Sequence, residues 1–205
     1  MAWDIREVIK MADRSKYPIT ANISNRHLHV SERDLQILFG EGYKLTNIRD
    51  LIQPGQFACK ETVTIATLRN KMEKVRIIGP TRKQTQVEIS KTDSFLFGLN
   101  PPTRESGKLA DSSPITIIGP KGKVDLTEGC IIAKRHVHLL PSDAEPLGIK
   151  DLDIVQVRVG IGTGRETIFG DVVCRVTPTS ALECHLDTDE ANACLLKNGD
   201  KIFIL

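Results

Sequence analysis

One short pattern occurs twice in this sequence and limits the folds that the chain can adopt. The segment RHLHV at Arg26–Val30 returns as RHVHL at Arg135–Leu139, an offset of 109 residues. Each copy follows a strand-like run and precedes a predicted helix start. A second repeat, IIGP, occurs at Ile77–Pro80 and at Ile117–Pro120. A chain of 205 residues is long enough for two domains, so we expect two related β units.

Short β-strand patterns dominate the chain around these repeats. Runs rich in Val, Ile and Thr alternate with Gly-Pro, Pro-Gly, Asn and Asp turns. The predicted strands are 19–23, 62–68, 75–78, 86–89, 115–118, 130–133, 154–159, 172–176 and 201–204. The predicted helices are short and lie near 31–39, 141–147 and 188–196. Many short strands with few helices indicate a mainly β protein, built as barrels or as a sandwich.

The domain organisation follows from the repeat and from turn-forming residues. Residues 4–12 carry apolar side chains at helical spacing, so we predict a short amphipathic helix within an N-terminal segment, 1–16. The stretch 101–114 is rich in proline, glycine and serine and is the best linker candidate. We therefore place the first β unit at 17–105 and the second at 106–205, and we allow for strands exchanged between them.

Composition narrows the functional classes. The net charge of +2, from 28 basic and 26 acidic residues, does not fit a nucleic-acid-binding protein. No apolar run reaches the length of a membrane span, and the N-terminal residues lack the apolar core of a secretion signal. The five cysteines are scattered and form no C-x-x-C pair, which is typical of reduced thiols. We expect a cytoplasmic globular protein.

The five histidines lie in three places: His27 with His29, His136 with His138, and His185 alone. In a strand, residues i and i+2 point to the same face, so each H-x-H pair projects two imidazoles side by side. Two such pairs among so few histidines are hard to explain by chance, although a duplication can copy one pair into the other. Imidazole-rich sites suit zinc first, then iron, copper or nickel. This count exceeds one tetrahedral zinc site, so we expect two metals, or one metal and a catalytic histidine.

The alternating stretch after the first Gly-Pro turn offers a carboxylate to such a metal. Gln84, Gln86 and Glu88 share one face of the predicted strand, which makes Glu88 a candidate ligand. The pattern alone favours the alternative that Glu88 is a solvated strand residue. Arg82 opens the same stretch, and a guanidinium beside a metal indicates an oxyanion substrate such as phosphate. An ordinary surface role for Arg82 stays open, and the neighbouring Lys83 would serve equally well.

Cys184, next to His185, invites comparison with a Cys–His nucleophile. Neighbouring side chains of a strand point to opposite faces, so we do not expect this pair to converge. The sequence also contains no nucleophile elbow, P-loop or dinucleotide-binding glycine motif. Covalent catalysis through Cys184 is therefore disfavoured.

Several long motifs together resemble those of one known family. They are Ser24–Val30 (SNRHLHV), Gln53–Ala58 (QPGQFA), Gly79–Pro80 followed by Arg82–Ser90 (RKQTQVEIS), Arg135–His138 (RHVH) and His185–Asn192 (HLDTDEAN). This set resembles the phosphate propanoyltransferases of the propanediol-utilisation type, which are phosphotransacylases associated with bacterial microcompartments. The resemblance covers most of the chain. It implies a fold of two β-barrels capped by short helices, with the active site between them.

The resemblance also implies a site with two zinc ions and identifies its residues. The ligands implied for the first zinc, which the sulfur of coenzyme A can complete, are His27, His29 and Glu88. The ligands implied for the second zinc, which water would complete, are His136, His138 and His185. The residue implied for phosphate is Arg82. The residues that match the family's contacts to coenzyme A are Ser24, Arg76 and Asn192.

The reaction implied by the resemblance is the reversible transfer of a short acyl group, propanoyl or acetyl, between coenzyme A and phosphate. Zinc would stabilise the thiolate leaving group and the oxygen of the acyl carbonyl. Arg82 would hold the phosphate within attack distance. No covalent enzyme intermediate is needed. We also expect a homo-oligomer.

Two features depart from the family pattern. Pro146 lies in the helix predicted after the second H-x-H, where a helix former is usual, and should shorten that helix. Microcompartment members often carry an N-terminal helix as an encapsulation tag, followed by a linker. Here the linker before Ile19 is almost absent. The segment 1–16 is therefore either a tag that contacts shell or core proteins of a microcompartment, or a helix packed on the barrel.

Two other functional classes compete with a phosphotransacylase. A cupin-like metal oxygenase or isomerase also combines an H-x-H strand in a barrel with a later Glu and His. That signature needs a Glu four or five residues after the pair, whereas Glu32 follows His29 by three. A non-catalytic metal-binding module does not explain why Arg82 and Glu88 accompany the histidines.

Overall fold

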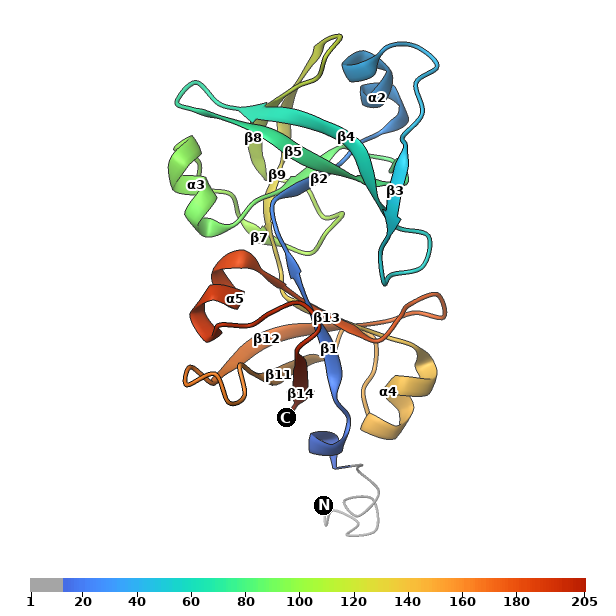
Figure 1. Cartoon of the computed structure of the whole chain (residues 1–205), viewed down its shortest axis with the longest axis vertical. Helices are drawn as coiled ribbons and strands as arrows, with labels where there is room; N and C mark the ends of the chain where they lie inside the picture. Colours follow the sequence, from blue (N-terminus) through green and yellow to red (C-terminus); the bar gives the residue numbers. More distant parts are fainter. Residues whose placement is uncertain (1–12) are drawn as a thin grey trace. The chain divides into compact units, whose positions relative to one another are not determined.

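The structure, a computed structural model that describes residues 13–205, is mainly β (Figure 1). Its strands form two closed barrels of six strands each, and four short α-helices accompany them in the described residues. The predicted fold class of two helix-capped β-barrels is therefore confirmed. The amphipathic helix predicted at 4–12 lies outside the described residues. Within residues 13–205, no helix is long and apolar enough to cross a lipid bilayer.

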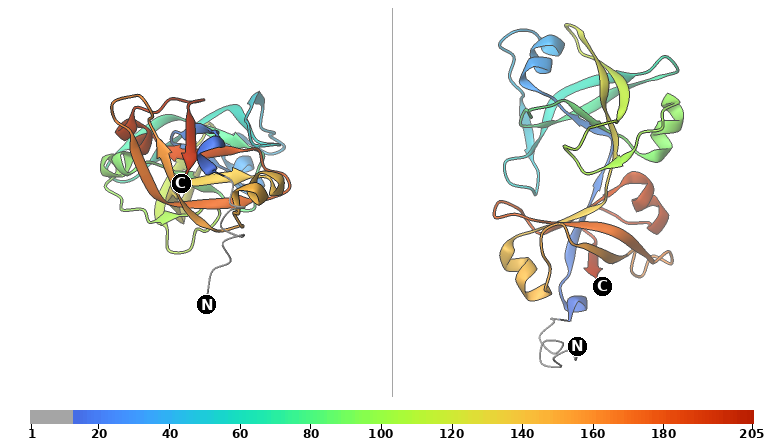
Figure 2. Two further views of the ribbon diagram at one scale, coloured as in Figure 1. Left: turned by 90° about the horizontal axis from the view of Figure 1, so that it is seen from below. Right: turned by 180° about the vertical axis from the view of Figure 1, so that it is seen from behind.

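Unit 1 combines residues 13–24 with Arg135–Leu205. Its barrel runs in the order β1-β13-β10-β12-β11-β14 and closes where β14 pairs with β1. Helices α4 and α5 lie on opposite sides of this barrel in the front view and in the back view (Figures 1 and 2). The elements of unit 1 are the 3-10 helix η1 (Arg14–Lys16), β1 (Ile19–Ser24), β10 (His136–Leu139), α4 (Pro141–Leu147), β11 (Ile154–Val159), β12 (Thr167–Val176), β13 (Glu183–Asp187), α5 (Thr188–Cys194) and β14 (Lys201–Ile204).

Unit 2 is the continuous segment Asn25–Lys134. Its barrel runs in the order β4-β5-β2-β6-β9-β8 and closes where β8 pairs with β4. Strand β3 extends the sheet beside β4, and β7 extends it beside β9. The elements of unit 2 are β2 (His27–His29), α2 (Glu32–Phe39), β3 (Asn47–Asp50), β4 (Phe57–Ala66), β5 (Lys71–Gly79), β6 (Gln86–Glu88), α3 (Lys91–Phe97), β7 (Thr103–Arg104), β8 (Ser113–Ile118) and β9 (Lys123–Ala133).

The two barrels share one strand-pairing scheme. Strands β2 and β10 carry the H-x-H pairs, and each lies between a parallel and an antiparallel neighbour. The parallel neighbours are β5 and β12, and the antiparallel neighbours are β6 and β13. Strands β6 and β13 in turn lie parallel to β9 and β1. Helices α2 and α4 follow the H-x-H strands, while α3 and α5 follow β6 and β13. The internal duplication predicted from the repeats is thus a property of the whole fold.

The first strand of each repeat lies in the barrel of the other unit. Strand β1 precedes β2 along the chain but pairs with β13 and β14 in unit 1. Strand β9 precedes β10 but pairs with β6 and β8 in unit 2. The units consequently divide at 24/25 and 134/135, whereas the sequence pattern predicts one boundary at 105/106. The stretch 101–114 lies inside unit 2, where Thr103–Arg104 forms β7, because hydrogen bonds to β9 order it.

Alternation along the strands separates an apolar interior from a polar outer face in each barrel. In unit 1, Val137, Cys184 and Leu186 point into the core, so the histidines between them lie on the outer face. In unit 2, Leu28 and Val87 point into the core in the same way. Both H-x-H pairs therefore project from the outside of a barrel wall.

Helix α4 spans the predicted residues 141–147 with Pro146 near its end, and α3 and α5, which contain no proline, also have 7 residues, so shortening by Pro146 stays a prediction. The helix ends at Leu147, and Gly148 follows in the left-handed conformation with φ 62°. It has 7 residues, against 8 in α2, its counterpart in unit 2. Proline has no backbone N–H to donate, so it removes one hydrogen bond from an element that holds few.

Candidate metal centres

Three imidazoles converge on the outer face of unit 1. His136 and His138 lie two residues apart on β10, and β13 places His185 directly opposite His136. Residues opposite each other on an antiparallel pair, and residues two apart on one strand, share a face. The three ring centroids accordingly lie 4.7, 4.9 and 5.1 Å apart. The H-x-H geometry predicted from the sequence brings these three histidines together.

The nitrogen atoms of this set suit a cation. The three ligand atoms all lie within 4.8 Å of one another, and Nε2 of His136 is 3.1 Å from Nε2 of His138. Among the described residues, Nε2 of His185 is buried and finds no hydrogen-bond partner. Burial, together with the neighbouring histidines and Arg175, lowers the pKa of His138 to about 3. His138 is thus neutral at pH 7, which is the form that binds metals.

The corresponding set in unit 2 contains a carboxylate. His27 and His29 lie on β2 with ring centroids 5.1 Å apart, and β6 places Glu88 directly opposite His27. The Nε2 atom of His27 is 3.6 Å from Oε2 of Glu88. The three ligand atoms again lie within 4.8 Å of one another. Glu88 is buried, so the alternative that it is a solvated strand residue does not hold.

The backbone fixes the imidazoles of unit 2 in one tautomer. The Nδ1 atom of His27 lies 2.8 Å from the carbonyl oxygen of Asn25, and Nδ1 of His29 lies 3.0 Å from that of Ile78. A carbonyl oxygen only accepts, so Nδ1 carries the proton and the Nε2 lone pair is left for a ligand. Burial, with nearby His27 and Arg82, lowers the pKa of His29 to about 3. Both donor sets therefore fit a divalent metal that takes nitrogen and oxygen ligands, of which zinc is the first choice.

Arg82 lies beside the donor set of unit 2 and is tied to it by hydrogen bonds. Its backbone N–H donates to the carbonyl of Val30 at 2.8 Å, directly after the H-x-H strand. Its Nη1 donates to Oγ of Ser106 at 3.0 Å, and Nε2 of Gln86 donates to the same oxygen at 2.8 Å. The same Gln86 nitrogen also donates to Oε1 of Glu88. The guanidinium of Arg82 and the carboxylate of Glu88 thus belong to one network.

Gln86 and Ser106 are site residues that sequence reasoning missed. Gln86 is 1% exposed and also accepts a hydrogen bond from the backbone N–H of Gly107 at 2.7 Å. The sequence places Gln86 on the face of Glu88, which was a usable signal. Ser106 lies in the stretch interpreted as a linker, and nothing in its local sequence marks it. Lys83, considered as an alternative to Arg82, is exposed.

The three residues matched to coenzyme A contacts belong to different units. Ser24 ends β1 and Asn192 is exposed on α5, both in unit 1. Arg76 lies on β5 in unit 2, where the parallel ladder places it opposite His27. Its Nη1 donates to the carbonyl of Cys59 at 2.7 Å. Their role in binding coenzyme A stays a prediction.

The cysteines offer no nucleophile. All five are buried, and burial raises the pKa of every one of these thiols, that of Cys130 to about 12. Cys184 points into the core of unit 1, while His185 points outward. A thiol that stays protonated at pH 7 is a poor nucleophile. The prediction against covalent catalysis through Cys184 agrees with this geometry.

The pairing scheme and the donor sets define a duplicated two-barrel protein with one candidate metal centre on each barrel. A comparison with protein families then identifies which such protein this is. Residues 20–197 match the family model described as phosphate propanoyltransferase. The chain belongs to the phosphate propanoyltransferase family and is an enzyme of the phosphate acyltransferase class, as the motif resemblance predicts.

Similar proteins extend this match over nearly the whole chain. A protein of Thermotoga maritima named phosphate propanoyltransferase is 52% identical over 201 residues, which are 98% of this chain and 95% of the relative. A protein of the same name from Lachnoclostridium phytofermentans is 48% identical and covers 96% of this chain and 91% of the relative. A third, from Rhodopseudomonas palustris, is 44% identical and covers 92% of this chain and 82% of the relative. This family membership disfavours the cupin-like and non-catalytic alternatives.

Proposed function

We propose that this enzyme is a zinc-dependent phosphotransacylase that converts a short-chain acyl-CoA, propanoyl- or acetyl-CoA, and phosphate reversibly into acyl phosphate and coenzyme A. The observation that carries the proposal is the set His27–His29–Glu88, which shares a hydrogen-bond network with Arg82. A cation site and an oxyanion site so close together are what transfer of an acyl group to phosphate requires. The names of the relatives support the same reaction.

Two zinc ions are assigned to the two donor sets. His27, His29 and Glu88 hold one, and the ligands of the other are His136, His138 and His185. When bound, zinc supplies Lewis-acid chemistry: it stabilises a thiolate and polarises a carbonyl oxygen. The carbonyls of Asn25 and Ile78 hold protons on Nδ1 and so keep the Nε2 lone pairs of His27 and His29 available.

Arg82 binds and orients the phosphate. A guanidinium donates two parallel hydrogen bonds to a phosphate and stays charged at every accessible pH. Ser106 accepts a hydrogen bond from Nη1 of Arg82 and so holds this long side chain in place. Less conformational entropy is then lost when Arg82 binds phosphate. Ser24, Arg76 and Asn192 contact coenzyme A in this proposal.

The transfer is direct. A phosphate oxygen attacks the acyl carbonyl carbon, a C–O bond forms, the C–S bond breaks, and the electron pair leaves on the sulfur of coenzyme A. The five buried thiols, whose pKa values are raised, support a route without an acyl-cysteine intermediate.

Release of coenzyme A tests the proposal. Purified protein loaded with zinc is mixed with acetyl-, propanoyl- or butanoyl-CoA, with and without phosphate, and free thiol is measured with a chromogenic reagent. We expect thiol release that requires phosphate and two zinc ions per chain by elemental analysis. No release from any of the three substrates would reject the proposed activity.

We also propose that the segment 1–16 directs the enzyme into a bacterial microcompartment by contacting shell or core proteins, and that the enzyme otherwise stays in the cytoplasm as a homo-oligomer. The family resemblance supports this proposal. A fluorescent protein fused to 1–16 should form foci in cells that assemble microcompartments and should stay diffuse in cells that do not. Diffuse fluorescence in both would reject a targeting role.

A further inference from the structure

The duplicated pairing scheme assigns every donor in one barrel a counterpart in the other. In unit 2, His27 lies opposite Glu88 and His29 lies opposite Gln86. In unit 1, His136 lies opposite His185 and His138 lies opposite Glu183. Glu88 therefore corresponds to His185, and Gln86 corresponds to Glu183. Each barrel thus has a carboxylate directly opposite one histidine of its H-x-H pair, but these two carboxylates lie two residues apart in register.

Glu183 contacts His185 and lies near His138 in unit 1. It starts β13, two residues before His185, so its side chain shares the outer face of the barrel with them. It is 1% exposed, and its Oε2 lies 2.9 Å from the buried Nε2 of His185. Its Oε1 accepts a hydrogen bond of 2.7 Å from Nδ2 of Asn22 on β1. One carboxylate oxygen is thus fixed from β1 while the other faces the donor set.

Burial of a carboxylate is costly unless positive charge lies close to it. The imidazole of His185 is the group in contact here, with its Nε2 2.9 Å from Oε2 of Glu183. A divalent cation on the imidazole nitrogens would place further positive charge beside this carboxylate. Three imidazoles carry no negative charge when they bind a metal, so they alone would not balance the charge of that cation.

We propose that Glu183 is the acidic member of the donor set His136–His138–His185, so that its carboxylate strengthens binding of the divalent metal there. This inference rests on the metal assignment in the proposed function. Both centres would then share two histidines from an H-x-H strand and one carboxylate from the neighbouring strand. The centre of unit 1 has His185 in addition, where unit 2 has Glu88.

The substitution Glu183→Gln isolates the charge from the hydrogen bonds. Glutamine keeps an oxygen that can accept from Asn22 and an N–H group that can donate to Nε2 of His185. Only the negative charge is lost. The buried Glu61 on β4, which accepts hydrogen bonds from Tyr43 and Thr46 away from either donor set, provides the matched control Glu61→Gln.

Zinc titration of the metal-free full chain, without acyl-CoA or phosphate, tests the proposal. Competition with a chromogenic chelator gives the affinity of each centre, and the background variant His27→Ala leaves the set of unit 1 complete. We expect Glu183→Gln to weaken zinc binding in that background by about 10- to 100-fold, the usual effect of losing a carboxylate beside a metal ligand. Glu61→Gln should leave zinc binding unchanged. Equal affinities of Glu183→Gln and its parent would overturn the proposal.

Thermal unfolding of the metal-free protein separates the proposed role from a structural one. Glu183→Gln should keep the Tm of the metal-free parent, because the hydrogen bond from Asn22 can remain and a buried charge is removed. A lower Tm with unchanged zinc affinity would show that Glu183 only anchors β1, and would overturn the proposal. If Glu183→Gln does not fold, Glu183→Asp keeps the charge and is expected to bind zinc more tightly than Glu183→Ala. Failure of the wild type to bind zinc at all would instead reject the metal assignment of the proposed function.

Discussion

The two barrels share a backbone plan but differ in the chemistry placed on it. The candidate metal ligand opposite the first histidine of each H-x-H pair is Glu88 in unit 2 and His185 in unit 1. The loop before the third strand carries Arg82 in unit 2, whereas the matching loop at 177–182 in unit 1 has no basic residue. A duplicated scaffold has therefore diverged at the few positions that face a ligand, while the pairing that presents them has stayed the same. In the proposed function, unit 2 therefore combines a metal centre with a phosphate site, and unit 1 contributes a metal centre alone.

Loss of one donor in each barrel is expected to have the largest effect. His27→Ala and His136→Ala should each reduce bound zinc from two ions to one per chain and lower kcat by at least about 100-fold, because both centres take part in the proposed reaction. Elemental analysis and the thiol-release assay measure the two effects. A variant that loses one zinc and keeps full activity would show that its barrel is not catalytic.

Arg82 sharpens the comparison because unit 1 has no counterpart to it. Arg82→Ala should raise the KM for phosphate and lower turnover by about 100-fold, since a positioned charge opposite the oxyanion is lost. Zinc content should stay at two ions per chain. Lys83→Ala, at the exposed neighbouring position, is the control and should behave as wild type. Normal dependence on phosphate in Arg82→Ala would show that another group binds it.

Gln86 tests whether the network of unit 2 supports its metal centre. Gln86→Leu keeps the bulk but removes the hydrogen bonds to Glu88, Ser106 and Gly107. We expect zinc affinity at unit 2 to fall by about 10-fold, because Glu88 loses its orientation, while unit 1 keeps its affinity. Chelator competition in a His136→Ala background makes this measurement. An unchanged zinc affinity would show that Gln86 only holds the loop around Ser106 and Gly107 in place.

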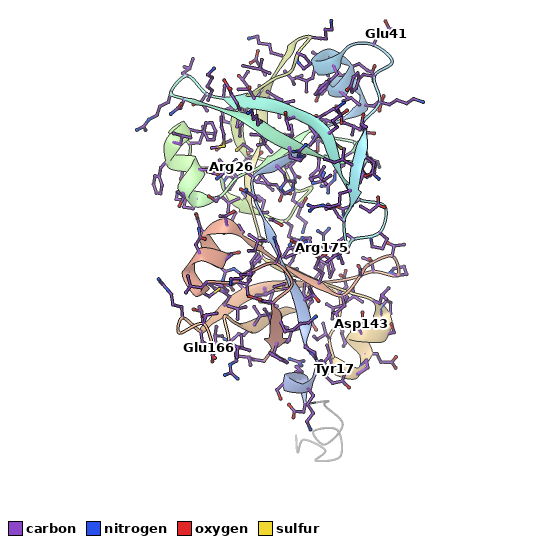
Figure 3. The ribbon with its side chains drawn as sticks, in the orientation of Figure 1. Tyr17, Arg26, Glu41, Asp143, Glu166 and Arg175 are labelled. Carbon is purple, nitrogen blue, oxygen red and sulfur yellow. The ribbon has the colours of Figure 1, made fainter. Side chains whose placement is uncertain are left out.

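A matched pair of ion pairs gives the smallest expected effect. Arg26 and Arg135 each directly precede an H-x-H pair. Each contacts an acidic side chain at the third position of a helix: Arg26 contacts Asp93 in α3, and Arg135 contacts Glu190 in α5. Arg26, labelled in Figure 3, donates two hydrogen bonds to the carboxylate of Asp93 at 2.8 and 2.9 Å. Arg135 contacts the carboxylate of Glu190 through Nε at 2.7 Å, and its Nη1 donates to the uncharged carbonyl of Gly170 at 3.1 Å. Loss of a charged hydrogen bond costs about 1.5–3 kcal/mol. In urea unfolding, Arg26→Ala should therefore destabilise the protein more than Arg135→Ala.

The sequence predicted the features that depend on local pattern. The H-x-H spacing placed His27 with His29 and His136 with His138 on common faces, because alternation in a strand is a local property. The family resemblance then favoured Glu88, Arg82 and the two-barrel architecture over the alternatives that the pattern left open. Glu88 shows the limit of pattern alone, since its burial depends on what packs over the strand.

Features that depend on which strands pair could not be predicted in the same way. Glu183 has no local signal, because its neighbour His138 lies 45 residues away in the sequence and meets it only through the β10–β13 register. Ser106 belonged to a stretch whose prolines and serines indicate a linker, yet Arg82 and Gln86 both donate to it. The unit boundaries depend on β1 and β9, whose partners are set by tertiary packing rather than by adjacent turns.

The exchange of β1 and β9 has a consequence for the order of folding. Unit 2 is one continuous segment, so all of its strands have been synthesised once the ribosome passes residue 134. Strand β1 is made first, but its partners β13 and β14 come more than 150 residues later. Contacts between residues so far apart in sequence form slowly, because a long loop must close before they are made. Strand β1 therefore cannot pair until β13 and β14 have been synthesised. We expect the barrel of unit 1 to close after that of unit 2 has had time to form.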